Sequence, residues 1–301
     1  MQKIIIDTDP GQDIDDLLAI LFALRRPELD IKAITTVTYP TKNRARLVKR
    51  LLRYLDRTDI PVAAGMELPL RPFSAEELKK QHDLSWSMNH YCFAEPEDPR
   101  DDPDDDDAVS LLIRTIEQHP GEIVLACIAP LTNIACAVRK KPGIAGKIKY
   151  IAMMGGEITQ DRAENNIAFD YNASEIVLTS GIPIFMGTWD ITRQFVLTMS
   201  ECAELFGKHP APVSQALARA IERWHPAQSW KPGPVMYDLF PMVWAFDRSY
   251  YTTKPMSIQV ETKNAAALGK TIVRGEVPSI EVSTEIHAAE LRELYLRTVL
   301  P

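Results

Sequence analysis

The sequence predicts an α/β protein with one domain, residues 1–301, in which helices flank a mainly parallel central sheet. Two observations carry this prediction. Short runs rich in β-branched residues alternate with longer helical patterns over much of the chain, which is typical of βα units around a parallel sheet. Neither a linker nor an internal repeat interrupts the alternation, so the 301 residues are expected to form a single unit.

The individual elements are predicted from apolar runs and from helical periodicity. Strands are expected at residues 3–7, 31–37, 60–63, 122–128, 147–154 and 183–187. Helices are expected between them at 15–25, 41–56, 106–118, 131–139 and 171–180. Beyond residue 187 the pattern predicts a helical stretch at 200–224, a proline-spaced loop at 225–238, a helix from 237, short antiparallel strands within 257–286 and a closing helix at 287–298.

The composition narrows the kind of partner. A net charge of -7 and a pI near 5.5 argue against a nucleic-acid or anionic-membrane surface, because both need clustered Lys and Arg. No apolar stretch approaches the ~20 residues that span a bilayer, and the N-terminal run is short for a signal peptide. The 4 cysteines have neither zinc-site nor disulfide-scaffold spacing. We therefore expect a reduced, cytoplasmic protein that acts on a small molecule.

One run of charge stands out, "EDPRDDPDDDDAVS" at residues 96–109. Asp is preferred at helix starts, where it accepts hydrogen bonds from free backbone amides. The run is therefore interpreted as a solvated loop that ends in an Asp N-cap for the following helix.

Five aspartates gather in the first turn of the chain, within "IIIDTDPGQDIDDLLAI": Asp7, Asp9, Asp13, Asp15 and Asp16. Neighbouring carboxylates repel one another unless a cation, a proton or water lies among them. The first of them lie where the first strand ends, and ligands of open parallel sheets bind at the carboxyl ends of the strands. Several carboxylates together suit Ca²⁺ or Mg²⁺ better than zinc.

The aspartates alone leave several kinds of site to consider. An EF-hand loop starting at Asp7 would need Gly at position 12 and Glu at position 18, and the chain has Gln12 and Leu18. A phosphotransferase with an aspartyl nucleophile and Mg²⁺ is one remaining interpretation. The other is a hydrolase that binds the hydroxyls of a sugar on a metal.

"DTDPGQDIDDLLAI" resembles the aspartate cluster that opens the inosine-uridine preferring nucleoside hydrolases. Further stretches resemble that family in the same order along residues 3–250. They are "AITTV" at 33–37, "DIPVAAG" at 59–65, "APLTNIACAV" at 129–138, "MMGGE" at 153–157, "ENNIAFD" at 164–170, "TWDIT" at 188–192 and "YDLF" at 237–240. The resemblance implies a nucleoside hydrolase-like fold and hydrolysis of the N-glycosidic bond of a ribonucleoside, or of a close N-riboside, to ribose and free base.

The resemblance also implies a Ca²⁺ cofactor, no covalent intermediate, and roles for particular residues. Asp9 resembles the general base that takes a proton from a calcium-bound water, and is itself a metal ligand. Asp16, the backbone carbonyl of Thr132 and Asp238 match further metal ligands. Asp15 matches the group that holds a ribose hydroxyl.

Some positions match the family and others depart from it. Glu164 and Asn166 match residues that hold the sugar. An insertion of two residues before Asp15 makes Asp13 an additional candidate metal ligand. Pro40 and Ile158 stand where many members have asparagine.

The group that protonates the leaving base is left open by the sequence. Tyr237 replaces the His of a His-Asp pair and is interpreted either as a proton donor or as a packing residue. His82 lies where some members carry an active-site His. Four more residues fall in segments that cover the base in the family, or else pack in the interior: Trp86, Trp224, His225 and Trp230.

Other functions remain in competition with the preferred one. A degenerate family member would bind a riboside or calcium without turnover. An aspartate-based phosphohydrolase would form an aspartyl-phosphate. The family resemblance implies a homodimer or homotetramer, and the sequence does not select purine or pyrimidine nucleosides as substrate.

Overall fold

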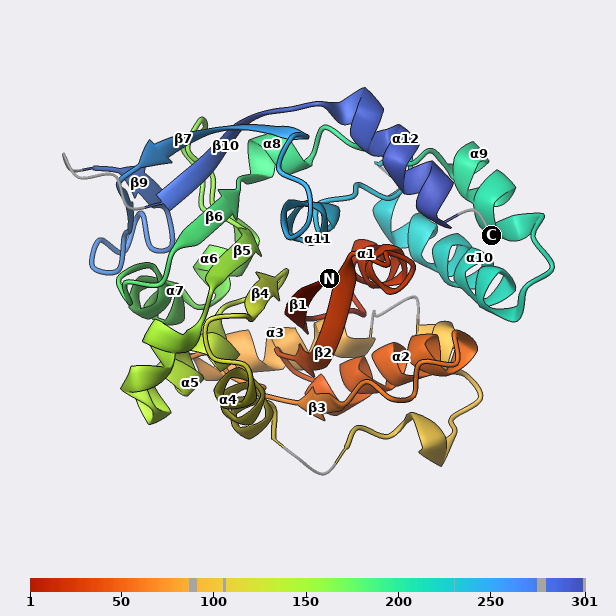
Figure 1. Ribbon diagram of the computed structural model, residues 1–301, viewed down its shortest axis with the longest axis horizontal. Helices are drawn as coiled ribbons and strands as arrows, with labels where there is room; N and C mark the ends of the chain where they lie inside the picture. Colours follow the sequence, from red (N-terminus) through yellow and green to blue (C-terminus); the bar gives the residue numbers. More distant parts are fainter. Residues whose placement is uncertain (87–90, 105–106, 230, 275–279, 300–301) are drawn as a thin grey trace.

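A computed structural model describes residues 1–86, 91–104, 107–229, 231–274 and 280–299, without the side chains of 82–86 and 91. An eight-stranded sheet with the order β3-β2-β1-β4-β5-β6-β10-β7 crosses the molecule. Neighbouring strands are parallel throughout, except that β7 runs antiparallel to β10. The predicted fold class, an α/β protein with a mainly parallel sheet, is confirmed (Figure 1).

The strands are short, and β4, β5 and β6 are entirely buried, whereas β7 at the edge of the sheet is mostly accessible. Those of the large sheet are β1 (Gln2–Thr8), β2 (Leu29–Thr36), β3 (Val62–Ala64), β4 (Val124–Cys127), β5 (Tyr150–Met154), β6 (Ile184–Gly187), β7 (Tyr251–Met256) and β10 (Ile280–Ile286). A separate antiparallel pair consists of β8 (Ile258–Val260) and β9 (Thr271–Val273).

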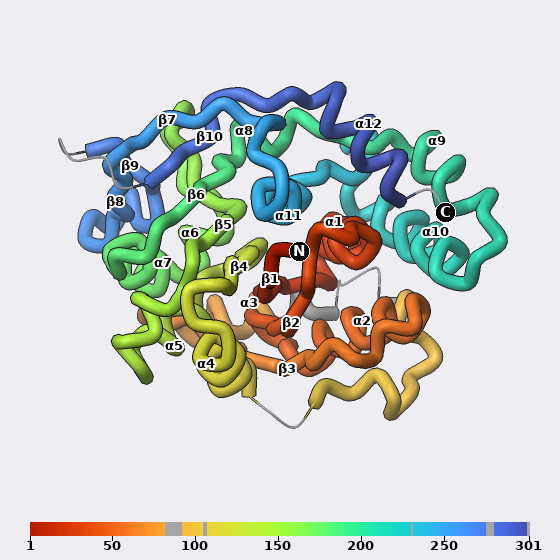
Figure 2. Tube along the Cα trace, viewed as in Figure 1, coloured from red at the N-terminus to blue at the C-terminus, as the bar shows by residue number. Residues whose placement is uncertain are grey.

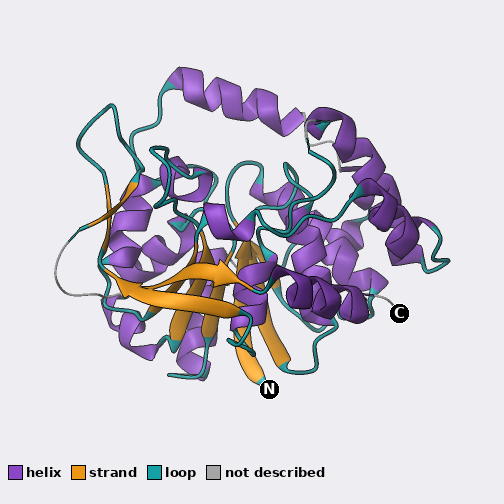
Figure 3. Ribbon diagram, turned by 90° about the horizontal axis from the view of Figure 1, so that it is seen from above, coloured by secondary structure: helices purple, strands orange, loops and turns teal. Residues whose placement is uncertain are grey.

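Helices cover both faces of the sheet (Figure 3). On one side lie α1 (Asp15–Leu24), α2 (Thr41–Tyr54), α10 (Pro212–Trp224), α11 (Leu239–Trp244) and α12 (Ala288–Val299). On the other lie α4 (Ala108–Gln118), α5 (Thr132–Lys140) and α7 (Tyr171–Leu178). The remaining helices are α3 (Ala75–Trp86), α6 (Asn165–Phe169), α8 (Trp189–Thr192) and α9 (Met199–Cys202).

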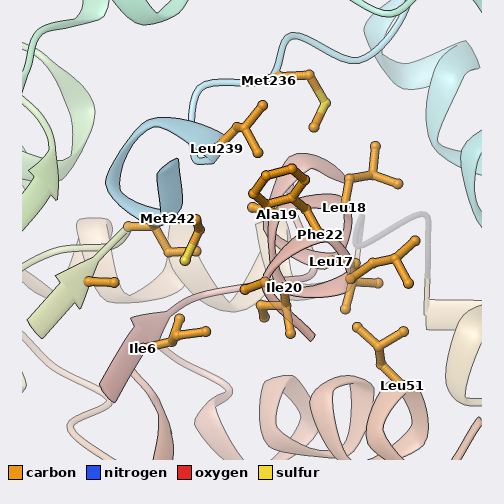
Figure 4. Packing of buried hydrophobic residues seen from close by; sticks show 14 of the residues in the cluster. Ile6, Leu17, Leu18, Ala19, Ile20, Phe22, Leu51, Met236, Leu239 and Met242 are labelled. Atoms are coloured by element: carbon orange, nitrogen blue, oxygen red, sulfur yellow. The ribbon is translucent and has the colours of Figure 1, made fainter. Parts of the chain in front are cut away.

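The N-terminal strand is the centre of the hydrophobic core. Ile4 and Ile6 of β1 belong to the cluster packed under α1, whereas Ile5 belongs to the cluster on the opposite face, as the alternation of side chains along a strand requires. Nearly every residue of α1 is buried, and Figure 4 shows its side chains surrounded by Leu51 of α2 and Met242 of α11. Figure 2 shows β1 in the interior of the trace and α12 at its periphery.

The order of the strands reverses beside β1. From β1 the chain continues to β2 and β3 on one side, and then returns to β4, β5 and β6 on the other. In open α/β sheets such a switch point opens a crevice at the carboxyl ends of the strands, where ligands bind. The aspartates that follow β1 therefore lie at the edge of this crevice.

Most of the predicted elements are confirmed within a few residues, and the differences have local causes. The structure adds helix α3, for which the sequence gave no clear periodic signal. The stretch predicted as a helix at 200–224 is broken into α9, a π-helical turn at Ala203–Gly207 and α10. Gly207 and Pro212 interrupt the pattern, since proline is favoured in the first turn of a new helix. The strand predicted from residue 147 begins at Tyr150, because Pro142–Lys147 forms a 3₁₀ turn.

The acidic run at 96–109 is only partly a solvated loop. Its N-cap is confirmed, because the Asp107 carboxylate accepts a hydrogen bond of 2.8 Å from the Ser110 amide. The solvated interpretation is wrong for Asp101, which is buried and paired with Arg50 at 2.5 Å and Arg53 at 2.8 Å. Arg50 also donates to carbonyls of the segment that precedes Asp101. The ion pairs thus attach this connection to α2.

Among the described residues, no helix combines the length and the apolar character that a membrane crossing needs.

Candidate active site

A cavity of about 840 Å³ opens at the carboxyl ends of the central strands. Its lining includes Asp9 after β1, Thr38 after β2, Ile128 after β4 and Met154 at the end of β5. Volumes of roughly 300–1,000 Å³ are typical of sites for small molecules and cofactors. The cavity therefore occupies the crevice at the switch point, where the strand order placed a ligand site.

Three buried carboxylates meet at one end of the cavity. Asp15 and Asp16 begin α1, Asp238 precedes α11, and carboxylate oxygens of all three lie within 4.8 Å of one another. Burial raises the pKa of Asp16 to about 6, and burial together with the neighbouring carboxylates raises the pKa values of Asp15 and Asp238 well above their usual range. Such a group is stable only with protons or a cation among its oxygens.

Asp9 lies beside this cluster. Its backbone amide donates to Oδ1 of Asp16 at 3.1 Å, and the Thr8 hydroxyl donates to the same oxygen at 2.5 Å. Burial raises the pKa of the Asp9 carboxyl well above its usual range; the Arg44 guanidinium opposes that shift, and the charge on Asp16 adds to it. Arg44 itself is buried, and it holds the turn by donating to the backbone carbonyls of Asp9, Pro10 (3.0 Å) and Thr38 (2.8 Å).

The donors of the cluster suit a hard divalent cation. Three buried carboxylates in one cluster favour Ca²⁺ or Mg²⁺ over softer metals. Asp13 is not one of the three clustered carboxylates. Its Oδ2 lies 2.5 Å from Nζ of Lys231, whose side chain is 5% exposed. An ion pair therefore takes the place of the metal contact considered for Asp13.

Thr132 and Ile128, which both follow β4, are the two residues whose backbone carbonyls we compare as possible ligands of a cation at the cluster. Thr132 is buried, opens α5 and donates its hydroxyl to Asp170 at 2.8 Å. A carbonyl inside a helix points along the axis toward the amide four residues on, and Thr132 does not line the cavity. Ile128, at the end of β4, does line it.

Two of the predicted sugar-binding residues lie together across the cavity. Glu164 is buried at the N-terminus of α6 and accepts hydrogen bonds from the amides of Asn166 (2.8 Å), Ile167 (3.1 Å) and Gly156 (3.0 Å). Burial raises the pKa of Glu164, and these amides oppose the shift. Asn166 donates from Nδ2 to the Met154 carbonyl at 3.2 Å, so both side chains are held in place at the end of β5.

Tyr237 lines the cavity next to Asp238. Burial, followed by the charges on Asp15 and Asp13, raises the pKa of Tyr237 to about 12, and a hydrogen bond with the Trp189 side chain opposes the shift. The indole N–H can only donate, so the Tyr237 oxygen accepts this bond and keeps its own proton. The Lys231 ammonium lies 5.5 Å from the centre of the Tyr237 ring.

The other aromatic and histidine residues predicted near the base are either outside the described part of the structure or outside the cavity lining. His82 and Trp86 belong to α3, but their side chains lie outside the described residues, as does Trp230 altogether. Trp224 is fully buried in the hydrophobic core and does not line the cavity, so of its two interpretations the structure favours packing in the interior over covering the base. His225 lies outside the cavity lining, with Nε2 3.2 Å from the Lys231 carbonyl.

Several cavity residues were not assigned a role from the sequence. Lys231 and Arg44 are separated from the aspartate motif by tens to hundreds of residues, and no spacing rule connects them to it. Trp189 lies in the family-like stretch at 188–192, and the insertion before Asp15 was the available hint for Lys231, because an additional carboxylate at a turn of like charges needs a partner.

The fold and the site together define an α/β protein with a buried cluster of carboxylates in a cavity at the switch point of its sheet. The family model for the inosine-uridine preferring nucleoside hydrolases matches residues 4–293, and the chain belongs to this family. The resemblance stated from the sequence is thereby confirmed. The protein is a hydrolase acting on N-glycosyl compounds, a nucleosidase, from a family whose activity is metal-dependent.

Individual relatives cover nearly the whole chain. The pyrimidine-specific ribonucleoside hydrolase of Salmonella arizonae is 32% identical over 299 residues, which cover 94% of this chain and 93% of that protein. A plant nucleoside hydrolase structure superposes with a TM-score of 0.83 at 26% identity and covers 99% of both chains. The purine-preferring ribonucleoside hydrolase of Gardnerella vaginalis has a similar fold, with a TM-score of 0.86 at 24% identity, covering 99% of this chain and 98% of that chain.

Proposed function

We propose that the protein hydrolyses the N-glycosidic bond of a ribonucleoside, or of a close N-riboside, with Ca²⁺ as cofactor and Asp9 as general base. The observation that carries this proposal is the position of Asp9 beside the carboxylates of Asp15, Asp16 and Asp238 at the end of one cavity. A base for water and a site for a cation are thus adjacent. A nucleoside also fits a cavity of about 840 Å³.

In this proposal Asp16 and Asp238 bind the cation, and the backbone carbonyl of Ile128 takes the role that the resemblance gave to Thr132. Bound there, Ca²⁺ supplies a fixed positive charge that holds ribose oxygens and makes water more acidic. Asp9 accepts the proton as water attacks the anomeric carbon. The cation next to Asp9 favours the ionised form of its carboxyl, which is the form that accepts a proton.

The sugar is held by carboxylates that also stabilise its charge. Cleavage passes through an oxocarbenium-like ribose, so negative groups near the ring lower the barrier. Asp15 and Glu164 are the buried carboxylates available for this task, with Asn166 as a neutral partner for a hydroxyl. Because backbone amides fix Glu164, little reorientation is needed during the reaction.

Tyr237 is the proposed donor of a proton to the departing base. Its raised pKa keeps the phenol protonated near neutrality. Trp189 donates to the phenol oxygen, which leaves the phenol proton available to a group in the cavity. The relatives carry opposite base preferences in their names, pyrimidine-specific and purine-preferring, so the proposal covers both classes of base.

Calcium binding by the purified protein tests the proposed site directly. Isothermal titration calorimetry on chelator-treated wild type is expected to give one tight site per chain. Asp238→Asn removes one ligand and is expected to weaken binding by about 100-fold, within the range for loss of a charged ligand. Asp247→Asn, a change of the same type outside the cavity, is the control. Equal affinity in all three proteins would contradict the proposed site.

A further inference from the structure

Helix α3 forms one wall of the cavity, and the sequence gave no clear signal for it. Residues 71–81, from the approach to α3 into the helix, contribute Arg71, Phe73, Glu77, Lys80 and Gln81 to the lining. We name these five residues the α3 wall. The helix passes behind the central strands in Figure 1, and the wall is distinct from the strand ends that carry the aspartates.

Two charged residues of the α3 wall, Arg71 and Glu77, already have partners. Arg71 pairs through Nη2 with Glu77 at 2.7 Å and donates from Nε to the Phe169 carbonyl at 2.7 Å. A hydrogen bond from the Ser74 amide, and to a smaller extent one from Arg71, lowers the pKa of Glu77 to about 2. The guanidinium of Arg71 also lies 5.0 Å from the centre of the Phe73 ring, and Phe73 meets Phe169 edge to face at 6.1 Å. This part of the wall is a preformed, partly aromatic surface.

Gln81 differs from these neighbours because its amide has no hydrogen-bond partner in the part of the chain that the structure describes. The residue is 8% exposed and lines the cavity, and neither Nε2 nor Oε1 has a hydrogen-bond partner among the described residues. A buried amide with both ends unpaired destabilises the folded protein. The same amide offers one donor and one acceptor side by side to a molecule in the cavity.

The part of a nucleoside that matches this amide is the base. In the proposed function the ribose oxygens belong to the cation, Asp15, Glu164 and Asn166, on the strand side of the cavity. The heterocycle is the remaining polar part, and its edge carries adjacent donors and acceptors with which Gln forms two hydrogen bonds. Phe73 lines the same cavity, and an aromatic surface in a pocket suits a planar ring.

We propose that Gln81 is a specificity-determining residue that contacts the base of the substrate through both ends of its amide. This inference rests on the proposed function and extends it to the leaving group. A leaving group that lacks an N–H donor next to an acceptor cannot form both hydrogen bonds with the Gln81 amide. Selectivity for nucleobases over other aglycones is then a property of the α3 wall.

Substrates with the same sugar and two kinds of leaving group, a nucleobase or nitrophenol, separate a contact with the base from a contact with the sugar. The experiment measures kcat/KM for inosine, uridine and p-nitrophenyl β-D-ribofuranoside with calcium-loaded wild type, Gln81→Met and the control Lys79→Gln. Lys79 is exposed on the same helix and does not line the cavity. In Gln81→Met the nucleoside value is expected to fall by about 10- to 100-fold relative to the nitrophenyl value, with no change of ratio in the control.

A second measurement does not depend on turnover. Because Met replaces an unpaired buried amide with an apolar chain of similar length, the ligand-free Gln81→Met protein is expected to melt at a higher temperature than wild type. A lower melting temperature would mean that the amide is paired within the protein and would overturn the inference. If Gln81→Met is not recovered in folded form, the ratio of kcat/KM between nucleoside and nitrophenyl riboside is measured with Gln81→Ala instead.

The outcomes distinguish this inference from the proposed function. An unchanged substrate ratio in an active variant overturns the role of Gln81 and leaves nucleoside hydrolysis intact. An equal loss on both substrates assigns Gln81 to the sugar or to the wall and also overturns the inference. Inactivity of wild type on all three substrates overturns the proposed function itself and, with it, the inference.

Discussion

The aspartates of the first turn occupy different surroundings although they lie within ten residues. Asp7 is buried, with hydrogen bonds from Thr35 and Asn133. Asp13 pairs with Lys231, whereas Asp15 and Asp16 join a carboxylate from the far end of the chain. One short motif thus supplies a structural acid, an ion pair and part of a cation site.

The sequence predicted the members of this site that belong to contiguous motifs. Asp9, Asp15 and Asp16 follow a strand and start a helix, so their common location follows from the local pattern. Lys231 and Gln81 could not be predicted, because their positions depend on long-range packing and on a helix with weak periodicity. The same limit applies to Trp224, since a tryptophan at the end of a helix has no signal in the sequence that separates core from cavity.

Replacing Asp9 by Asn tests the general base. The substitution keeps the shape of the side chain and removes its ability to accept a proton, so kcat for nucleosides is expected to fall by about 100- to 10,000-fold. Steady-state kinetics at saturating calcium measure the loss, with the melting temperature as a control for folding. A variant with the rate of wild type would exclude Asp9 as the base.

Replacing Tyr237 by Phe tests the proton donor. The ring and its packing remain, and only the hydroxyl that accepts from Trp189 is removed. We expect kcat for nucleosides to fall by about 100-fold or more, while p-nitrophenyl riboside, whose leaving group departs as a stable anion, loses little. Parallel rates for both substrates would assign Tyr237 to packing.

At the scale of elements, the C-terminus of helix α2 lies within two residues of its predicted end. The helix was predicted at 41–56 and ends at Tyr54. Two residues later, Asp56 has a positive φ of 53°. The Arg57 amide donates to the Leu52 carbonyl at 2.9 Å, and the Asp56 amide donates to the Arg53 carbonyl. These two bonds form a Schellman motif, in which the residue of positive φ is usually Gly.

Replacing Asp56 by Gly is therefore expected to stabilise the protein by about 0.5–1 kcal/mol. Gly removes both the strain of a positive φ and a negative charge at a helix C-terminus. For a chain of this size the melting temperature should rise by roughly 1–4 °C. Asp56→Ala removes the charge and keeps the strain, so calorimetry of both variants separates the two contributions. Equal melting temperatures of Gly and Ala variants would contradict the strain argument.

Helix α3 is the longest element that the sequence analysis missed, and its consequences are functional. Its amphipathic pattern is short and carries mostly charged residues in "AEELKKQHDLSW", so periodicity alone does not separate it from a polar loop. Its position depends on contacts of the preceding segment, such as that of Arg71 with the Phe169 carbonyl. The cavity wall was therefore predictable only from tertiary structure.

At the scale of the whole molecule, the sheet explains why the site lies where it does. The buried strands place the ends of β1, β2, β4 and β5 at a common edge, and the strand order reverses there. The fold class and the location of the site could both be predicted from the alternation of strands and helices along the sequence. The single domain over 1–301, the cytoplasmic location and the homodimer or homotetramer stay predictions, and sedimentation of the purified protein tests the last of them.

The buried carboxylates predict a calcium effect on stability that depends on pH. Burial raises the pKa of Asp16 to about 6 and that of Asp7 to about 7, from an ordinary 3.8. Without metal, these protonated acids stabilise the fold at low pH, and that contribution is lost as pH rises from about 4 to 7. A cation binds the ionised form of the cluster. The increase in melting temperature produced by calcium should therefore be small at pH 5 and larger at pH 7.5.

Differential scanning calorimetry with calcium and with a chelator measures this effect. At 100 times Kd a bound ligand stabilises the fold by ~2.7 kcal/mol, which is roughly 5–10 °C for a chain of this size. Asp238→Asn should lose most of the difference at pH 7.5. A calcium effect that is independent of pH would contradict the link between the cluster and the cation.

The most direct test of metal-dependent nucleoside hydrolysis is a reducing-sugar assay on the purified protein. Inosine, adenosine, guanosine, uridine and cytidine are incubated with enzyme in calcium, in chelator, and in chelator followed by excess calcium. The account predicts ribose release from at least one nucleoside that stops with chelator and returns with calcium. Release that persists after metal removal, or none from any nucleoside with folded, calcium-bound protein, would contradict it.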